Sequence, residues 1–125
     1  MIRTRPFVSG LVLSLGVLTK LVIIALEKHT PHTKLARVYA LIREGRVLTT
    51  TGALRGALDL GIHDLRGMCD VILRLSHTDF YKSMTTHQDH RVWQDVYRLH
   101  LAQGRWAYIK LTVLEDVLIV SFKEL

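Results

Sequence analysis

The chain has 125 residues, 49% of them hydrophobic and 22% charged, a composition that fits one compact domain and excludes a second of similar size. Its formal net charge is +6, but three of the 17 cations and no acid precede Glu27, which leaves 14 cations against 11 acids in the body. This mild excess is compatible with a polyanionic partner without selecting RNA over a membrane surface. The single cysteine, Cys69, excludes an intrachain disulfide and suits a reducing compartment.

An almost wholly apolar stretch, residues 7–26, follows Arg3 and Arg5 in the manner of a signal peptide or a membrane anchor. Against that interpretation, Lys20 lies inside the stretch, where it would cost about 3 kcal/mol at the bilayer centre. No cleavage site of small residues precedes Glu27. Residues 1–25 are therefore treated as an extension, and residues 26–125 as a single domain.

A first helix is predicted from a cap at Thr33 to a stop at Gly45. Its apolar face carries Leu35, Val38, Leu41 and Ile42. Its other positions carry Lys34, Arg37 and Arg43, which form either an RNA-facing patch or, more simply, a solvated face. The pattern predicts a helix that packs one face on a core.

Two further helices are predicted before residue 79. Thr50 or Thr51 caps the second, which ends near Gly61, and Asp64 caps the third. The inward positions of the third helix are Met68, Val71, Ile72 and Leu75. All three predicted helices therefore precede the predicted strands in the chain.

After Asp79 the apolar pattern changes to a period of two, which predicts strands at about 80–85, 92–99, 106–113 and 117–123. Helices followed by a strand meander indicate an α+β fold, with N-terminal helices packed on a C-terminal antiparallel or mixed sheet. No linker or repeat interrupts it.

The last two strands suggest a register. A two-residue turn at Glu115 and Asp116 would pair Leu114 with Val117. The face toward the helices would then hold the pairs Val113–Leu118, Leu111–Val120 and Ile109–Phe122. The other face would hold Thr112–Ile119, Lys110–Ser121 and Tyr108–Lys123, each pair about 5 Å apart between Cβ atoms. This polar cluster is either an ordinary solvated sheet face or a site.

The segment 79–98, DFYKSMTTHQDHRVWQDVYR, breaks ordinary strand material with polar, basic and amide side chains. Together with Thr30–Thr33, Gly67–Cys69, Tyr108–Lys110 and Val117–Glu124, it resembles the MqsR family of toxin endoribonucleases over about residues 27–125. The resemblance implies a RelE-like toxin fold and a type II toxin that cleaves mRNA without a ribosome, a metal or a cofactor. It further implies cleavage at GC-containing sites such as GCU, inhibition of translation and growth, an MqsA-like antitoxin partner and a cytoplasmic location.

By the same resemblance, the catalytic residues are Lys82, Gln94, Tyr108 and Lys123. Lysines can hold the scissile phosphate and stabilise its developing charge, and an amide can orient the phosphate or sugar. Tyr108 is the candidate for proton transfer, on the expectation that neighbouring lysines lower its pKa. The residues do not decide which group is the general base.

A second set of residues is predicted to contact RNA less directly. Lys110 and Arg98 are candidates for neighbouring phosphates, and His90 for an auxiliary acid or base. Candidates for stacking a splayed base are Trp93, Tyr97, Tyr81 and Trp106. The histidine pairs 29/32 and 87/90 lack a carboxylate at ligand spacing, so no metal is expected. A histidine at 87, where an aromatic phenol is expected, and extra length around 105–107 depart from the family pattern.

Two alternatives remain for the whole chain: a catalytically inert antitoxin-binding or regulatory module of the same fold, and a membrane-anchored variant associated through residues 7–26. Leu26 stands where family members begin with Met, and leucine is the literal translation of a TTG start codon. The favoured hypothesis is that residues 1–25 are not translated natively, in which case no stable membrane association is expected. An anchor or signal, and an ordered extra element, are the alternatives.

Overall fold

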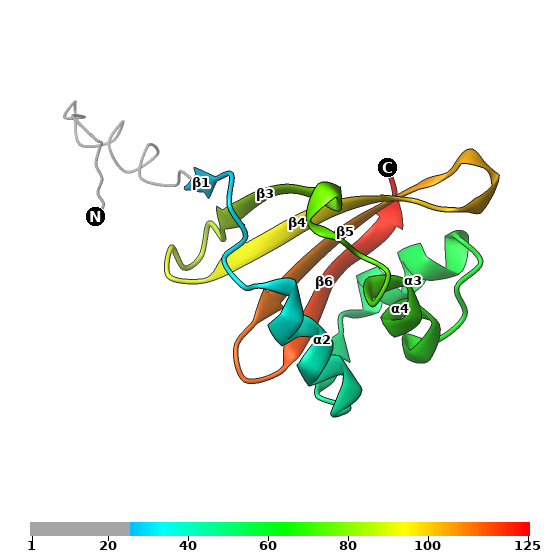
Figure 1. Ribbon diagram of the computed structural model, residues 1–125, viewed down its shortest axis with the longest axis horizontal. Helices are drawn as coiled ribbons and strands as arrows, with labels where there is room; N and C mark the ends of the chain where they lie inside the picture. The colour runs from blue at the N-terminus through cyan, green and yellow to red at the C-terminus, as the bar shows by residue number, and fades with distance from the viewer. Residues whose placement is uncertain (1–25) are drawn as a thin grey trace.

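The computed structural model describes residues 26–125, which form one six-stranded sheet with three α-helices gathered on one side of it (Figure 1). The helices are α2 (Leu35–Arg43), α3 (Thr51–Asp59) and α4 (Leu65–Ile72). The strands are β1 (Glu27–Lys28), β2 (Val47–Thr49), β3 (Phe80–Thr85), β4 (Trp93–His100), β5 (Trp106–Val113) and β6 (Val117–Glu124). The predicted α+β class is confirmed, whereas the extension 1–25 lies outside the described residues.

The strand order is β1-β3-β4-β5-β6-β2, with β2 parallel to β6 and every other pair antiparallel. The four longer strands fall within a residue of their predicted bounds. The two edge strands were not predicted, because two or three residues are too few to show a period of two. Among residues 26–125, the helices are all too short to cross a bilayer.

The helix caps explain where α3 and α4 begin. Thr50 accepts a hydrogen bond from the amide of Ala53, and Asp64 accepts one from the amide of Gly67, as predicted. The predicted cap at Thr33 is wrong: α2 begins at Leu35 after Lys34, which makes no side-chain cap. Thr33 is instead held by the sheet, as described next.

A buried carboxylate ties the segment before α2 to the sheet. Asp95 on β4 is 5% exposed and accepts hydrogen bonds from the amides of His32 (2.9 Å) and Thr33 (2.9 Å). The hydroxyl of Ser83 on β3 donates a third at 2.6 Å. These partners compensate the desolvation of the charge, and they place residues 26–33 along the β3 edge.

The β5–β6 turn differs from the predicted one. Val113 faces Val117, so the loop has three residues, and Val120 is the extra residue of a bulge that restores the predicted pairs from Lys110–Ser121 onward. Arg46, just before β2, holds this turn by donating to Glu115 O (3.0 Å) and Asp116 Oδ1 (3.0 Å). The four predicted pairs nearest the turn are therefore wrong, and the three beyond the bulge are confirmed.

The bulge also changes which β6 side chains meet the helices. Val117 and Ile119 join Phe122 in the core cluster, whereas Leu118 and Val120, predicted to point inward, do not. The core lies between the helices and this side of the sheet. Within residues 26–125, no α-helix lies on the opposite side of the sheet, which is called the open face below.

Helix α3 lies so close to β6 that one position requires glycine. A Cβ on Gly56 would stand 1.9 Å from the carbonyl oxygen of Phe122, whereas a Cβ on Gly52 of the same helix would meet nothing within 4 Å. The backbone contact cannot be relieved by a rotamer change, because the obstructing atom belongs to a central strand.

We predict that Gly56→Ala lowers the free energy of unfolding by about 3 kcal/mol or more through overpacking. Gly52→Ala, the matched control, is expected to raise it by about 0.5 to 1 kcal/mol, since alanine restricts the unfolded chain and favours helix. Urea unfolding of both variants measures the difference. Equal effects of the two substitutions would contradict this packing of α3 on β6.

Candidate active site

The open face of the sheet gathers basic and phenolic side chains in two adjacent rows. In one row, Lys82, Val96, Lys110 and Ser121 face one another across β3 to β6. In the next row, Arg98, Tyr108 and Lys123 face one another across β4 to β6. Three of the four residues implied as catalytic therefore lie together: Lys82, Tyr108 and Lys123. Neighbours in such rows have Cβ atoms about 5 Å apart.

A second bulge adds an aromatic side chain to this face. The β3–β4 register shifts between Phe80 and Lys82, so Tyr81 is the extra residue. Phe80 packs edge-on against Tyr97 on the helix side, 5.5 Å between ring centroids. The Arg98 guanidinium lies 3.9 Å from the Tyr81 ring centroid, and the Lys82 ammonium 5.4 Å from it. Consecutive residues 81 and 82 thus both belong to the cluster.

An acidic residue from the first strand reaches the cluster. Glu27 Oε2 lies 2.6 Å from Lys82 Nζ, and the pairing of β1 with β3 brings it there. The hydrogen bond to Glu27 raises the pKa of Lys82, against an opposing effect of burial. Lys82 therefore stays protonated and is held in place. This contact was not predicted, because it depends on a two-residue strand.

The environment of Tyr108 reverses one expectation. Its ring is flanked by the ammonium groups of Lys123 (5.3 Å) and Lys110 (6.0 Å). Burial nevertheless raises the pKa of Tyr108, and the opposing charge of Lys82 only reduces the effect. The predicted lowering of the Tyr108 pKa is therefore wrong, and the phenol is a proton donor at neutral pH.

Lys110 occupies the centre of the cluster, although it was predicted to have only a secondary role. Burial lowers the pKa of Lys110, and the nearby charges of Lys123 and Lys82 lower it further. Between Lys110 and Lys82 lies Val96, which is fully buried. A lysine with a lowered pKa loses its proton at a lower pH than an exposed lysine, which makes Lys110 a candidate base.

Gln94 and His90 lie toward the other end of the rows. Gln94 faces Met84, diagonal to the Lys82–Val96 pair, and is partly buried. Its side-chain amide has no hydrogen-bond partner within residues 26–125, so it is free to bind a ligand on the open face. His90 lies in the exposed β3–β4 loop, beyond the Gln94 row, and the structure does not bring it to the lysines.

Two of the four stacking candidates have side chains on the helix side of the sheet. Tyr97 is wrong because it is buried, whereas the assignment of Trp93, which is partly buried, stays a prediction. Tyr97 is 1% exposed and lies in the core, where burial raises its pKa strongly. Trp93 stacks on His32 (5.6 Å) beneath the Lys28 ammonium (4.1 Å). Tyr81 (41% exposed) and Trp106 (45% exposed) remain accessible.

Comparison with known proteins places this arrangement in a family. The model of the motility quorum-sensing regulator family, described as the toxin of MqsA, matches residues 30–124. The chain belongs to this family. It is also 58% identical over 99 residues to the Escherichia coli (strain K12) protein named mRNA interferase toxin MqsR. The aligned residues cover 79% of this chain and 99% of that protein.

The MqsR family match contains both rows of the open face, from Lys82 to Lys123, together with the Asp95 network. Glu27 precedes the matched residues. The basic cluster is thus part of the MqsR-like domain itself, and the carboxylate over Lys82 comes from the segment just before it.

The lowered pKa of Lys110 has a measurable effect on stability. The protonated amine is less favourable in the folded chain than in the unfolded one, so stability is greatest above pH 10.5, falls as pH decreases toward the lowered folded-state pKa, and is constant below it. We predict that Lys110→Met raises the free energy of unfolding near neutral pH, and that this gain shrinks near pH 10.

Urea unfolding at the two pH values tests this prediction, with Lys34→Met as the control for loss of an exposed lysine, just before α2. A loss of stability for Lys110→Met near neutral pH, relative to the control, would contradict the description of Lys110 as an electrostatically disfavoured group.

Proposed function

We propose that this chain is the toxin of a type II toxin–antitoxin system and that it cleaves mRNA on the open face of its sheet. Membership of the MqsR family and likeness to a protein named mRNA interferase toxin support the activity. The observation that carries the location is the pair of rows in which Lys82, Lys110 and Lys123 surround Tyr108. Cleavage needs neither a ribosome nor a metal, and it occurs at GC-containing sites such as GCU.

The proposed reaction is a transesterification within the RNA. The neutral amine of Lys110 accepts the proton of the 2′-OH, and the 2′-oxygen forms a bond to the adjacent phosphorus. The bond from phosphorus to the 5′-oxygen breaks, and that oxygen takes the proton of the Tyr108 phenol. The products are a 2′,3′-cyclic phosphate and a 5′-hydroxyl end. The lowered pKa of Lys110 and the raised pKa of Tyr108 support these opposite roles.

The remaining residues stabilise charge and position the substrate. Lys82 and Lys123 bind the non-bridging oxygens, whose negative charge increases in the transition state, and each is worth about 2 to 4 kcal/mol by comparison with an oxyanion donor. Glu27 holds Lys82 at 2.6 Å until a phosphate competes for it. The free amide of Gln94 orients the sugar or phosphate of the adjoining nucleotide.

The family description, toxin of MqsA, supports an MqsA-like protein as the antitoxin. Such a partner would neutralise the toxin in the cytoplasm, where the mRNA substrate is found. An inert module of the same fold is the alternative. Positions 82, 94, 108 and 123 carry lysine, glutamine, tyrosine and lysine. This set favours the enzyme, since an inert relative has no need of it.

The test is end-mapping of a defined, ribosome-free transcript incubated in EDTA with residues 26–125. Fragments with recurring GC-containing ends are expected from the unmodified domain. The Lys82→Ala and Tyr108→Phe variants are each expected to cleave about 100-fold more slowly, and the double variant to produce no detectable fragments.

Lys34→Ala, which removes an exposed lysine just before α2, is the matched control and is expected to cleave normally. An intact transcript from the folded, unmodified domain would contradict the proposal and favour the inert module. Equal losses from Lys34→Ala and Lys82→Ala would place the RNA on the helix side instead.

The acid–base assignment predicts a pH profile. Under subsaturating RNA, the cleavage rate should rise with pH through a pKa below 10.5 as Lys110 loses its proton, and fall above pH 10 as Tyr108 loses its own. Lys110→Arg should be slower and lack the rising limb, because a guanidinium does not deprotonate. A rising limb that survives in Lys110→Arg would assign the base to another group.

A further inference from the structure

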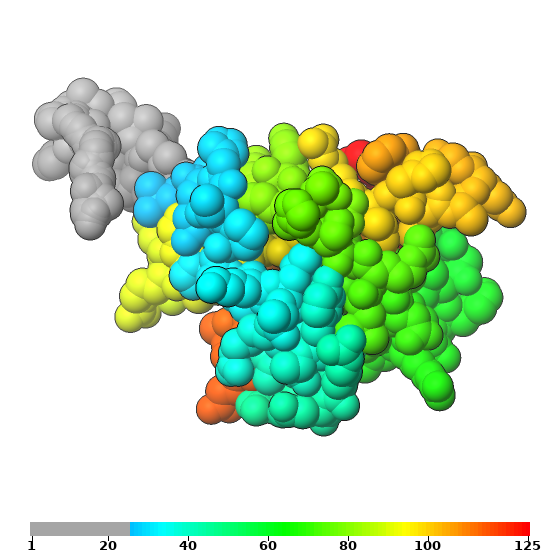
Figure 2. Space-filling model, viewed as in Figure 1, coloured from blue at the N-terminus to red at the C-terminus, as the bar shows by residue number. Residues whose placement is uncertain are grey.

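The segment before α2 lies along the edge of β3 and is held there at both ends. It comprises residues 26–33 and is called the N-terminal strap below; Figure 2 shows it, in blue, on the surface beside the β3–β4 loop. At its start, Leu26 N donates to Thr85 Oγ1 at 2.8 Å, and Thr85 N donates to Leu26 O at 2.9 Å. At its end, two amides donate to the buried Asp95 carboxylate. The backbone of Glu27 is therefore fixed beside β3.

Glu27 reaches from this strap to one lysine of the rows. Its Oε2 lies 2.6 Å from Lys82 Nζ. A phosphate oxygen bound by this ammonium would lie at a similar distance, since both contacts are charge-assisted hydrogen bonds. The ammonium has two further donors, but a phosphate bound through them would lie beside the carboxylate and be repelled by it. The Glu27 carboxylate and a phosphate group therefore exclude each other from Lys82.

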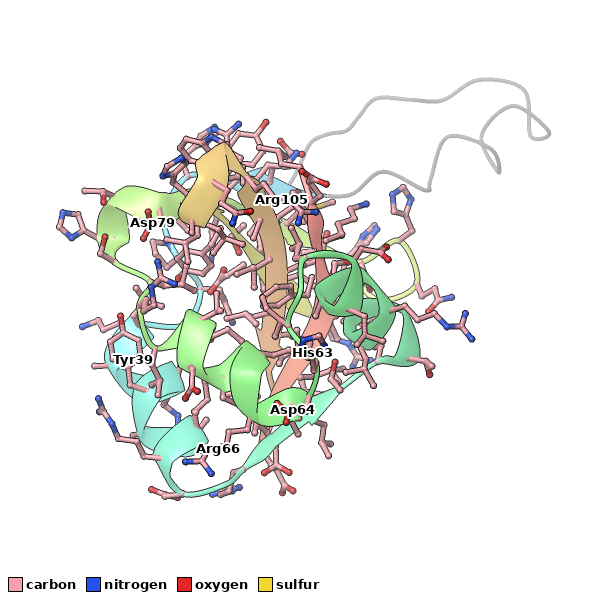
Figure 3. All side chains as sticks on the ribbon, turned by 90° about the vertical axis from the view of Figure 1, so that its right-hand side faces the viewer. Tyr39, His63, Asp64, Arg66, Asp79 and Arg105 are labelled. Atoms are coloured by element: carbon pink, nitrogen blue, oxygen red, sulfur yellow. The ribbon has the colours of Figure 1, made fainter. Side chains whose placement is uncertain are left out.

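The Glu27–Lys82 contact differs from the other ion pairs. Within residues 26–125, Lys110 and Lys123 have no carboxylate partner. The remaining pairs of these residues hold turns and the base of the β4–β5 hairpin, where Figure 3 labels Arg105: Arg46–Asp116, Arg91–Asp89 and Arg105–Glu124. Glu27 is thus the one acid of the described residues that neutralises a lysine proposed to bind phosphate.

The pair can open while the strap stays in place. The Glu27 side chain is 46% exposed, so its rotation into solvent leaves the core intact. The backbone on either side remains held, because the Lys28 ammonium also lies 3.0 Å from His32 Nδ1 and 4.1 Å from the Trp93 ring centroid. A carboxylate tethered in this way has a high effective concentration at the lysine. It can be displaced, but it never diffuses away.

We propose that Glu27 competes with RNA for Lys82: in the free protein its carboxylate holds the position of a phosphate oxygen, and it leaves when RNA binds. The inference rests on the proposed ribonuclease function and adds a residue that sets the affinity for the substrate. Because Glu27 is displaced before the reaction, it weakens RNA binding without changing the rate of the bound complex.

The competition acts most visibly on small anions. A single phosphate has to displace Glu27 unaided, whereas an RNA strand that also contacts Lys110 and Lys123 gains the free energy of those contacts. Glu27 therefore keeps single phosphates off Lys82 at concentrations at which an RNA strand still binds.

The first test is steady-state cleavage of a defined RNA by the full chain at low ionic strength. Glu27→Gln removes the charge and keeps the shape of the side chain, and it should lower KM about threefold or more while kcat changes less than about twofold. Glu124→Gln is the matched control, since it makes the same change of charge and breaks an ion pair with Arg105 instead. It should leave KM within about twofold of the unmodified value.

Three kinetic results would overturn the competition while the ribonuclease function stands. They are a KM that Glu27→Gln leaves unchanged or raises, an equal decrease of KM in Glu124→Gln, and a loss of kcat of about tenfold in Glu27→Gln. The last result would show that Glu27 stays on Lys82 and positions it in the bound complex.

An RNA that cannot be cleaved shows the displacement directly. With 2′-O-methyl RNA at saturation, the nuclear magnetic resonance signal of the Glu27 carboxylate carbon should move toward its position in the RNA-free Lys82→Ala variant, where the carboxylate has lost its partner. A Glu27 signal that stays in place while RNA binds would contradict the proposal.

If the full chain cleaves no RNA, the proposed function fails, and the competition is measured with inorganic phosphate alone. Phosphate should then perturb the Lys82 side-chain signals at a several-fold lower concentration in Glu27→Gln than in the unmodified chain. Equal concentrations, or no perturbation in either protein, would rule out competition at Lys82.

Discussion

The register of the sheet determines which side chains reach the open face, and two bulges set that register. In an unbroken strand, Tyr81 and Lys82 would point to opposite faces. The extra residue in β3 lets Phe80 pack on Tyr97 in the core while both following side chains join the cluster. The Val120 bulge in β6 likewise allows a three-residue turn near β2 and still brings Lys123 opposite Tyr108.

This arrangement concentrates positive charge without support from acidic residues on the central strands. The cost is visible at Lys110, whose pKa is lowered by burial and by the lysines on either side. Among residues 26–125, the one carboxylate that pairs with a lysine of the rows, Glu27, comes from the two-residue strand β1. Asp95 holds the segment after β1 through the amides of His32 and Thr33, so the first described residues complete the surroundings of Lys82.

Much of the fold follows from local signals, because caps and strand periods are properties of neighbouring residues. The caps at Thr50 and Asp64 and the four long strands were predicted on that basis. Thr33 does not cap α2, because its amide donates a hydrogen bond to the Asp95 carboxylate, 62 positions away. No local sequence pattern contains this tertiary contact. The β5–β6 turn failed for a similar reason, since Arg46 and β2 select its length.

In the candidate site, too, features set by neighbouring residues could be predicted, whereas features set by tertiary contacts could not. The cross-strand pair Tyr108–Lys123 could be derived from the sequence because the hairpin is local. The sign of the Tyr108 pKa shift could not, since it depends on how far burial exceeds the effect of the neighbouring charges. Tyr97 was misassigned because an aromatic residue in an alternating strand is equally compatible with either face until the helices are placed.

The central claim is that RNA lies on the open face, across the lysine rows. Its most direct test is a nuclear magnetic resonance titration of residues 26–125 with a short GC-containing RNA that carries 2′-O-methyl groups and cannot be cleaved. Saturable shifts are expected for the lysine side chains of positions 82, 110 and 123, the Tyr108 ring and the Gln94 amide, with α2 and α3 unchanged. Shifts confined to the exposed cations of α2, with the open face unaffected, would contradict it.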